Sequence, residues 1–375
     1  MSVEGRDESP MSSSEPGSSS GARQGVRSQH APQQRSSRGP FLMGCLVALA
    51  AVGTVIVLLV VGIMLMAAAI GGTVHTEGVY EAANVQELTV SGTPGDPKIA
   101  VVPVRGLLAS GANVLTGSDP ALVFKAMLER AKDDPKVRGV ILAVDSPGGG
   151  ITTCDVMHKA LKDFRKESGR PSVVLMEDVA ASGGYYVACG ADYIIAHPTS
   201  ITGSIGVLMP LLDAGDLMAK IGLTDRTVKS GEFKTMGSMF TQRTPEQWKR
   251  EKEVLEGLIT QMHERFVEVV VQGRKLAPDM VRAVADGRIY TSRQAVENGL
   301  VDAIGYHEDA VDKVKELAGI TSAHVVRYTR VLSLREMLFA RAGGNGLALG
   351  LDGRLPAHML SRPMYVWPAA AFQAD

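Results

Sequence analysis

Residues 172–186, SVVLMEDVAASGGYY, decide the fold of this 375-residue chain. Val173 to Met176 form a short apolar run that is typical of a strand buried between two layers of helices. Tyr185 to Cys189 have helical character, and Gly190 is a typical C-terminal stop. Ser182 therefore lies on a small-residue turn between a buried strand and a helix, where its hydroxyl either caps the helix or is displayed as a nucleophile.

Short apolar runs alternate with amphipathic stretches along much of the remaining chain. Because strands that alternate with helices pair in parallel through right-handed crossovers, this pattern predicts an α/β fold with a layered parallel sheet and flanking helices. Strands are expected at 99–104, 139–144 and 193–196, and helices after Asp119-Pro120, from about Thr153, and from the capping-box pattern at Thr244 to about Gln272. Residues 286–305 are expected to form a compact turn-helix-turn unit.

The N-terminal seventy residues differ in composition from the rest. Residues 1–40 are crowded with Ser, Gly, Pro, Gln and Arg, which predicts a disordered tail. Residues 41–70 carry no charged side chain and exceed the roughly 20 residues that a membrane-spanning helix needs, so they are predicted to be a transmembrane anchor. The small residues at 67–69 leave a cleavable signal peptide as the alternative. Arginines precede the apolar run and mainly acidic residues follow it, so the positive-inside rule places the N-terminus in the cytoplasm and the bulk of the chain outside it.

Charge and cysteine usage argue against two classes of site. The formal net charge of −1 gives no basic character of the kind that nucleic acid attracts. The three cysteines, Cys45, Cys154 and Cys189, have the spacing of neither a metal site nor a disulfide framework. Cys154 and Cys189 are therefore expected to be buried thiols, with a bridge between them left open.

Two glycine-rich turns end predicted strands, at 148–150 and at Ser182-Gly183. In open α/β sheets, ligands bind at the carboxyl ends of the strands. The backbone amides of Gly149 and Gly183 are therefore expected to stabilise an oxyanion together, a device in which one donor is worth on the order of 3 kcal/mol.

A serine nucleophile also needs a base. None of the eight histidines lies in a recognisable triad context, and His197, at a strand end, is expected to be structural. A lysine can act as the base when burial leaves its amine neutral. The segment 229–240 offers Lys229 and Lys234, and Lys234 lies among small and apolar residues that can desolvate it. Its spacing alone does not separate it from an ordinary loop lysine.

Five motifs, taken in this order, resemble the signal peptide peptidase A family. They are DSPGGG (145–150), DVAASGGYY (178–186), TGSIGV (202–207), KSGEFKTMGS (229–238) and DGRIYTSRQAVENGLVDAIG (286–305). The resemblance covers about residues 97–320. It implies a membrane-anchored serine-lysine peptidase with the fold shared by the Clp protease and crotonase superfamily.

The resemblance also implies a role for each residue that matches the motifs of the family. Ser182 matches the nucleophile and Lys234 the general base. Gly149 and Gly183 match the oxyanion-hole donors, and Ser204 matches the serine that orients the lysine. Family members assemble into rings or domes in which the lysine of one subunit reaches the serine of the next, so the resemblance implies a homo-oligomeric ring with shared active sites.

Met239 departs from the pattern of the family. Many relatives carry proline at this position, after the Gly-Ser pair, so the resemblance predicts a less rigid lysine loop in this chain.

The function implied is hydrolysis of remnant signal peptides and other hydrophobic peptides at the extracytoplasmic face of a bacterial cell membrane, without a cofactor, metal or nucleic acid. The expected parts are a cytoplasmic tail (1–40), the anchor (41–70), a juxtamembrane linker (71–96), the peptidase domain (97–328) and a tail of unassigned structure (329–375). A catalytically inactive scaffold of the same fold is one alternative, against which the presence of both Ser182 and Lys234 argues. A crotonase-like acyl-CoA enzyme is the other, and CoA is lacking outside the cytoplasm.

Overall fold

The computed structural model describes residues 53–59, 61, 85–110, 119–331 and 364–366. The chain divides into two units, residues 1–74 and 75–375. In the first unit, residues 53–59 and 61 are helical, and the rest of the predicted anchor at 41–70 lies outside the described residues. Within the described part of the chain, no helix combines the length and the apolar character that crossing a membrane requires.

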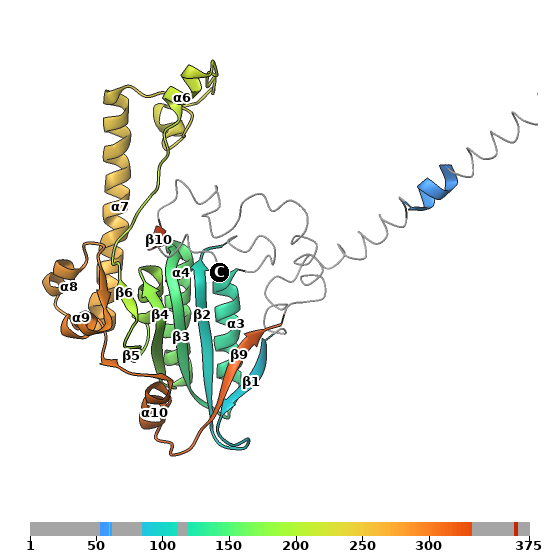
Figure 1. Cartoon of the computed structure of the whole chain (residues 1–375), viewed down its shortest axis with the longest axis vertical. Coiled ribbons are helices and arrows are strands. Elements are labelled where there is room, and N and C mark those ends of the chain that lie inside the picture. Colours follow the sequence, from blue (N-terminus) through green and yellow to red (C-terminus); the bar gives the residue numbers. More distant parts are fainter. Residues whose placement is uncertain (1–52, 60, 62–84, 111–118, 332–363, 367–375) are drawn as a thin grey trace, which may run out of the picture. The chain divides into compact units, whose positions relative to one another are not determined.

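One sheet, shown in Figure 1, forms the centre of the second unit. Its strands follow the order β1-β9-β2-β3-β4-β5-β8, and all neighbouring pairs are parallel except β1 with β9. The strands are β1 (Val85–Ser91), β2 (Lys98–Leu108), β3 (Val137–Gly150), β4 (Ser172–Ala181), β5 (Tyr193–Ala196), β8 (Ala303–Ile304) and β9 (His324–Arg330). Beyond the β4–β5 pairing, β6 (Ile201–Gly203) pairs with the end of β4, and β7 (Ile289–Thr291) pairs with β6.

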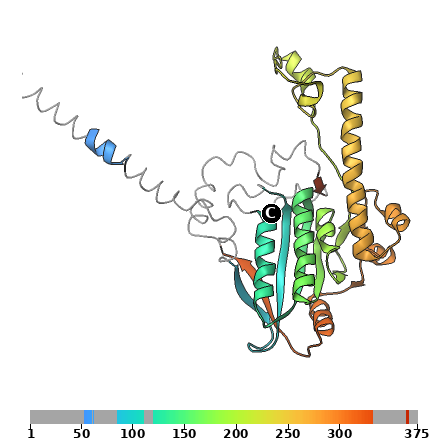
Figure 2. The same ribbon diagram turned by 180° about the vertical axis from the view of Figure 1, so that it is seen from behind.

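Helices cover both faces of the sheet, and the view from behind in Figure 2 shows α3 and α4 side by side on one of them. The side chains of Val140, Leu142 and Val144 lie in the core cluster that includes α3 (Pro120–Asp133), α4 (Ile151–Ser168) and α5 (Gly183–Ala188). Ile141 and Ala143, which alternate with them, pack on the opposite face with α10 (His307–Ala318). The prediction of a layered α/β fold with a mainly parallel sheet and flanking helices is confirmed.

Start signals in the sequence are used as predicted. The Asp119 side chain accepts a hydrogen bond from the Ala121 amide at the start of α3, and Thr244 and Gln247 form a capping box at the start of α7 (Pro245–Arg274). α4 begins at Ile151, earlier than the predicted Thr153, because the helix follows β3 without a loop.

The region expected at 97–328 extends further at both ends than the sequence pattern indicated. β1 falls inside the predicted linker 71–96 and pairs with β9, so part of that stretch belongs to the sheet. The predicted tail 329–375 contains β10 (Met364–Val366), which pairs with β3. The unit at 286–305 contains the short strands β7 and β8 in addition to α9 (Ser292–Glu297).

α7 carries a projecting segment away from the sheet, as Figure 1 shows. Its C-terminal turns bury Phe266, Val267 and Val270 beside α8 (Pro278–Val284), whereas its first turns stand clear of the sheet together with residues 209–244. We call residues 209–244 and the first turns of α7 the arm. It contains α6 (Gly215–Lys220) and the 3-10 turn η1 (Glu232–Thr235).

Candidate active site

Ser182 has a strained backbone between β4 and α5. Its φ of 50° and ψ of −115° lie outside the regions that L residues ordinarily occupy, and only two other described non-glycine residues have positive φ. Such strain costs about 1–3 kcal/mol and clusters at functional sites, where it displays a side chain on a sharp turn. The surrounding hydrogen bonds impose it: the Ser182 amide donates to the Gly203 carbonyl at 2.8 Å, and its own carbonyl accepts from the Tyr186 amide at 2.8 Å.

The hydroxyl of Ser182 is buried and unpaired. The residue is 1% exposed, and its Oγ has no hydrogen-bond partner among the described residues. Ser182 takes the N-cap position of α5, but its side chain makes no capping hydrogen bond. The interpretation of this residue as an ordinary helix cap is therefore wrong, and its hydroxyl is kept free at an energetic cost.

Ser204 lies directly beside Ser182. Ala181 of β4 pairs with Gly203 of β6, and the two serines are the residues that follow this pair. Ser204 is also buried and also has a positive φ, 50°. β4 and β6 thus end in two adjacent, strained serines, as expected if both belong to one site.

The oxyanion candidates lie at the same end of the sheet. Gly149 is the residue before the last one of β3. A side chain at this position would place its Cβ 2.1 Å from the Leu108 carbonyl oxygen, so only glycine fits. Gly184 lets α5 approach β3 just as closely, because a Cβ on it would lie 2.8 Å from the Ser146 carbonyl oxygen. The first approach packs the end of β3 against β2, and the second packs the helix that begins at Gly183 against β3.

Lys234 is the one candidate site residue that does not lie at this end of the sheet. It lies in η1 on the arm, exposed to solvent, and its side chain makes no hydrogen bond or ion pair with the described residues. The expectation that its own neighbours desolvate it is wrong for the single chain. Lys229, the other lysine of this segment, is occupied: its Nζ donates to the Glu232 carbonyl at 3.1 Å and to Thr235 Oγ1 at 3.0 Å.

Arg243 holds the loop that carries Lys234. Its guanidinium donates to the carbonyl of Thr235 at 3.0 Å, of Ser238 at 2.8 Å and of Thr241 at 2.9 Å, and to Glu251 Oε2 on α7 at 2.7 Å. The side chains of Arg243 and Glu251 are only 6% and 7% exposed. A buried ion pair and three hydrogen bonds to backbone carbonyls therefore hold this loop, which lacks proline at position 239, and its lower rigidity stays a prediction.

His158 on α4 supports the helix that follows Ser182. Its Nδ1 lies 3.2 Å from the Tyr186 carbonyl oxygen and must be the donor, since a carbonyl only accepts, and its ring packs edge-on against Tyr186. Burial, reinforced by the charge of Lys162, lowers the pKa of His158 to about 4.

The lowered pKa of His158 predicts that the folded protein loses stability in acid. The folded protein keeps His158 neutral down to about pH 4, whereas an unfolded histidine takes up a proton near pH 6.5. The stabilisation is therefore present above pH 6.5 and is lost as the pH falls from there towards 4. In urea unfolding, the drop in stability between about pH 7 and about pH 5 should be about 2 kcal/mol larger for the wild type than for His158→Gln. Equal drops would contradict this role.

The remaining predictions concern the cysteines, His197 and metal binding. Cys154 and Cys189 are both buried free thiols, and burial raises the pKa of each, that of Cys189 to about 12. His197 bonds to Thr199 and packs against Tyr306, a structural role as predicted. Among the described residues, no group of three or more His, Cys, Asp or Glu side chains is arranged to hold a metal ion.

The chain is similar to known peptidases in sequence. The model of peptidase family S49 matches residues 164–321. The putative signal peptide peptidase SppA of Enterococcus faecium is 38% identical over 252 residues, which are 66% of this chain and 72% of that protein. Protease 4 of Salmonella typhi is 30% identical over 295 residues, which are 77% of this chain and 46% of that protein. A solved membrane-bound stomatin-specific protease with a substrate peptide has a TM-score of 0.41 and 14% identity, over 67% of this chain and 99% of that chain.

A serine peptidase is the class of protein that these matches define. The chain belongs to peptidase family S49, among the proteases of the signal peptide peptidase A type, and the resemblance carried by its five motifs is confirmed.

Two features of the site escaped the sequence pattern. Arg243 stands next to a helix cap and has the sequence context of an ordinary surface arginine, and only the fold brings three carbonyl groups and Glu251 around it. Pairing of β10 with β3 joins residues more than two hundred positions apart, and the short aromatic segment at 362–368 gave no periodic signal for it.

Proposed function

We propose that this chain is a membrane-anchored endopeptidase in which Ser182 is the nucleophile and Lys234 of a neighbouring copy is the general base. The neutral lysine amine takes the proton of Ser182 Oγ as that oxygen attacks a peptide carbonyl. The amides of Gly149 and Gly183 hold the oxyanion, and Ser204 orients the lysine. The amine leaves with a proton from the lysine, and water then releases the acyl group from Ser182.

One observation carries this proposal: Ser182 has a buried, unpaired hydroxyl on a strained turn. A protein that needed the residue only for its fold would gain stability from a bonded or absent hydroxyl. The strained turn, Ser204 and Gly149 all lie at the carboxyl ends of β3, β4 and β6, where ligands of α/β sheets bind.

The arm supports assembly into a ring. It exposes large apolar side chains, including Val228 at 98% and Phe233, the neighbour of Lys234, at 42%. Apolar exposure on this scale marks an interaction surface. If the arm packs against the next subunit, the contact both buries these side chains and desolvates Lys234, which its own chain leaves in water.

Apolar peptides at the outer face of a bacterial membrane are the substrates that we propose. The uncharged run 41–70 and the arginines before it favour an anchor whose following residues, including the peptidase domain at about 97–328, lie outside the cytoplasm. Remnant signal peptides are apolar peptides released at that place.

Hydrolysis by the full chain in detergent micelles tests this function. We expect an internally quenched apolar peptide to be cleaved faster than a charged peptide of equal length, and a fluorophosphonate to label the wild type but not Ser182→Ala. Absence of both hydrolysis and labelling would favour the inactive scaffold. Hydrolysis of an acyl-CoA thioester without peptide hydrolysis would favour the acyl-CoA enzyme.

The contacts of Arg243 with Glu251 and with the carbonyl groups of the loop that carries Lys234 form what we call the Arg243 clamp. Loss of this clamp should release the loop. Arg243→Ala leaves the Glu251 charge buried and unpaired, which costs about 3–5 kcal/mol of local stability. We expect faster hydrogen exchange in residues 232–243 and a fall in kcat of about tenfold or more, because Lys234 is no longer held in place. Arg226→Ala, an exposed arginine of the same arm, is the matched control and should change neither quantity. Unchanged exchange in Arg243→Ala would show that the clamp does not hold the loop.

A further inference from the structure

Ser146 carries a buried hydroxyl in the glycine-rich end of β3. The residue is 0% exposed. Its Oγ donates a hydrogen bond to the Gly106 carbonyl on β2 at 2.7 Å and accepts one from the Gly148 amide at 3.1 Å. A hydroxyl can donate and accept at the same time, so this one side chain joins β2 to the last residues of β3.

The regular pairing of the sheet is interrupted at this place. The register of β2 with β3 shifts at Gly106, and the register of β3 with β4 shifts just before Ser146. Gly106 and Gly148 both have positive φ, 66° and 101°. Buried backbone groups at such an irregularity need partners outside the regular ladder, and the Ser146 hydroxyl is one for the Gly106 carbonyl and for the Gly148 amide.

The Gly148 amide that Ser146 holds directly precedes the proposed oxyanion donor. The Gly149 amide follows it by one residue, and peptide groups are planar, so the two torsion angles of Gly148 set the direction of the Gly149 N–H. Glycine has more conformational freedom than any other residue. A held Gly148 amide removes part of that freedom, and an oxyanion donor is most effective when it is already directed at the place where charge develops.

The backbone of Ser146 contacts the part of the site that carries the nucleophile. Ser146 pairs with Ala180, two residues before Ser182. A Cβ on Gly184 would lie 2.8 Å from the Ser146 carbonyl oxygen, so the helix that follows Ser182 packs directly on this residue. β2, β3 and β4, which these contacts join, lie side by side in the sheet of Figure 1. Ser146 therefore contacts both the oxyanion side and the nucleophile side of the site.

We propose that Ser146 is a positioning residue of the oxyanion site: its hydroxyl holds the Gly148 amide so that the Gly149 N–H points to the carbonyl oxygen of the substrate that Ser182 attacks. The hydroxyl acts through the backbone, because its own proton is donated to the Gly106 carbonyl. This inference rests on the proposed function, since it takes Gly149 as an oxyanion donor and Ser182 as the nucleophile.

Ser146→Ala in the full chain tests the proposal through kcat. Oxyanion stabilisation acts in the transition state and not on the bound substrate. We therefore expect kcat per folded chain to fall by about tenfold to a hundredfold, with KM for an apolar peptide changed by no more than about twofold. Ser146→Cys keeps a weak donor and acceptor at this position, so its kcat should lie between those of Ser146→Ala and the wild type.

Ser172→Ala is the matched control. Ser172 is also buried, and its Oγ also donates one hydrogen bond, to Asp192 Oδ2 at 3.0 Å, and accepts one from a backbone amide, that of Asp192 at 3.3 Å. It is the first residue of β4, whereas Ser182 follows the last. Its loss should lower stability and leave kcat per folded chain unchanged. Equal losses of kcat in Ser146→Ala and Ser172→Ala, or wild-type kcat in Ser146→Ala, would show that Ser146 has a structural role only.

An inhibitor that resembles the transition state distinguishes positioning from folding. Addition of the Ser182 hydroxyl across the carbonyl of an apolar peptide aldehyde gives a hemiacetal without a leaving group, and its oxygen takes the oxyanion position. Its inhibition constant should rise in Ser146→Ala by about the factor by which kcat falls. An unchanged inhibition constant would overturn the proposal.

Hydrogen exchange tests the same contact without catalysis. The amide hydrogens of residues 148–150 should exchange faster in Ser146→Ala than in the wild type and should be unaffected in Ser172→Ala. Unchanged exchange in Ser146→Ala would show that the hydroxyl does not hold these residues and would overturn the proposal. Faster exchange in a protein of which no form cleaves peptide or binds the aldehyde would refute the proposed function, and with it the role of the contact in catalysis, but not the contact itself.

Discussion

Replacing Ser182 with alanine is expected to lower kcat for peptide hydrolysis by about 10⁴-fold or more, because the covalent step loses its nucleophile. The same change should stabilise the fold. The Ser182 hydroxyl is buried without a partner among the described residues, and removing such a group recovers part of its desolvation cost, about 1–2 kcal/mol. Peptide hydrolysis and urea unfolding of the same preparation measure both effects, and a variant that keeps more than about a hundredth of wild-type activity would contradict the assignment.

Ser200→Ala is the matched control for this prediction. Ser200 is also buried, but its Oγ donates to the Met176 carbonyl at 2.8 Å. Its removal should cost about 1 kcal/mol and leave peptide hydrolysis nearly unchanged. Ser182→Ala should thus raise the free energy of unfolding and Ser200→Ala should lower it. This difference in sign distinguishes a serine that serves catalysis from one that stabilises the fold.

Replacing Lys234 with alanine is expected to lower kcat by about 10²- to 10⁴-fold, the range that loss of a general base covers. Its side chain is exposed and bonds to no described residue, so the stability of the isolated chain should not change. Lys234→Arg should not restore activity, because a guanidinium stays protonated and cannot accept the serine proton.

Lys220→Ala provides the control on the same arm. Lys220 ends α6, is exposed, and should contribute nothing to the reaction. If Lys220→Ala and Lys234→Ala lost equal activity, the loss would reflect a general effect of charge on the arm rather than a base at Lys234.

Local sequence signals predicted the central layers well. Val173 to Met176 form a buried strand, Asp119 and Thr244 cap helices, and Ser182 follows the strand end, because each feature depends on residues near in sequence. The carboxyl ends of parallel strands converge at one edge of an α/β sheet, so the placement of Gly149 and Ser182 at two strand ends is enough to predict that they lie near each other.

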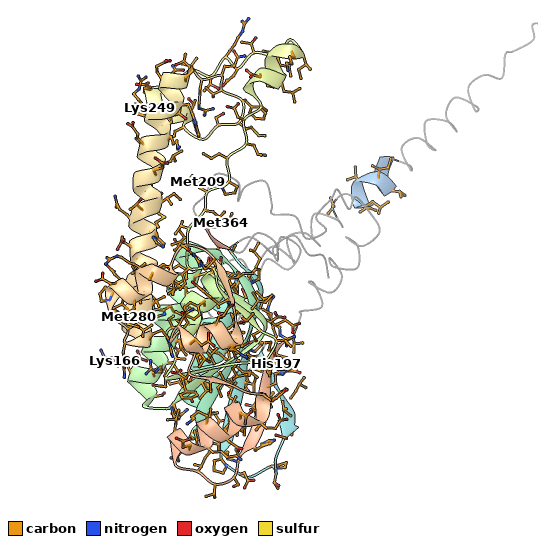
Figure 3. The ribbon with its side chains drawn as sticks, turned by 60° about the vertical axis from the view of Figure 1, so that its left-hand side comes forward. Lys166, His197, Met209, Lys249, Met280 and Met364 are labelled. Atoms are coloured by element: carbon orange, nitrogen blue, oxygen red, sulfur yellow. The ribbon has the colours of Figure 1, made fainter. Side chains whose placement is uncertain are left out.

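Features that depend on distant residues were not predictable in this way. The pairing of Met364 with Leu208 arises from a contact that only the folded chain creates. Arg243 and Glu251 are close in sequence, but their ion pair depends on how the loop before α7 folds against that helix, which no local pattern indicates. The apolar neighbours of Lys234 suggested that its side chain is buried, but η1 lies on the projecting arm and buries no residue. Figure 3 labels Lys249 near the start of α7, which belongs to the same arm. The composition of a segment does not distinguish apolar side chains that are buried within their own chain from those that are buried only in contact with another chain.

The shared site is the central claim, and mixing two inactive variants tests it most directly. Ser182→Ala and Lys234→Ala chains, carrying different affinity tags and produced together, are purified through both tags so that only mixed assemblies remain. If each site takes its serine from one subunit and its lysine from the next, about a quarter of the sites in a random ring are intact, and about a quarter of wild-type activity should return. Mixed assemblies no more active than either variant alone would contradict the account, because a dyad within one chain cannot be restored by mixing.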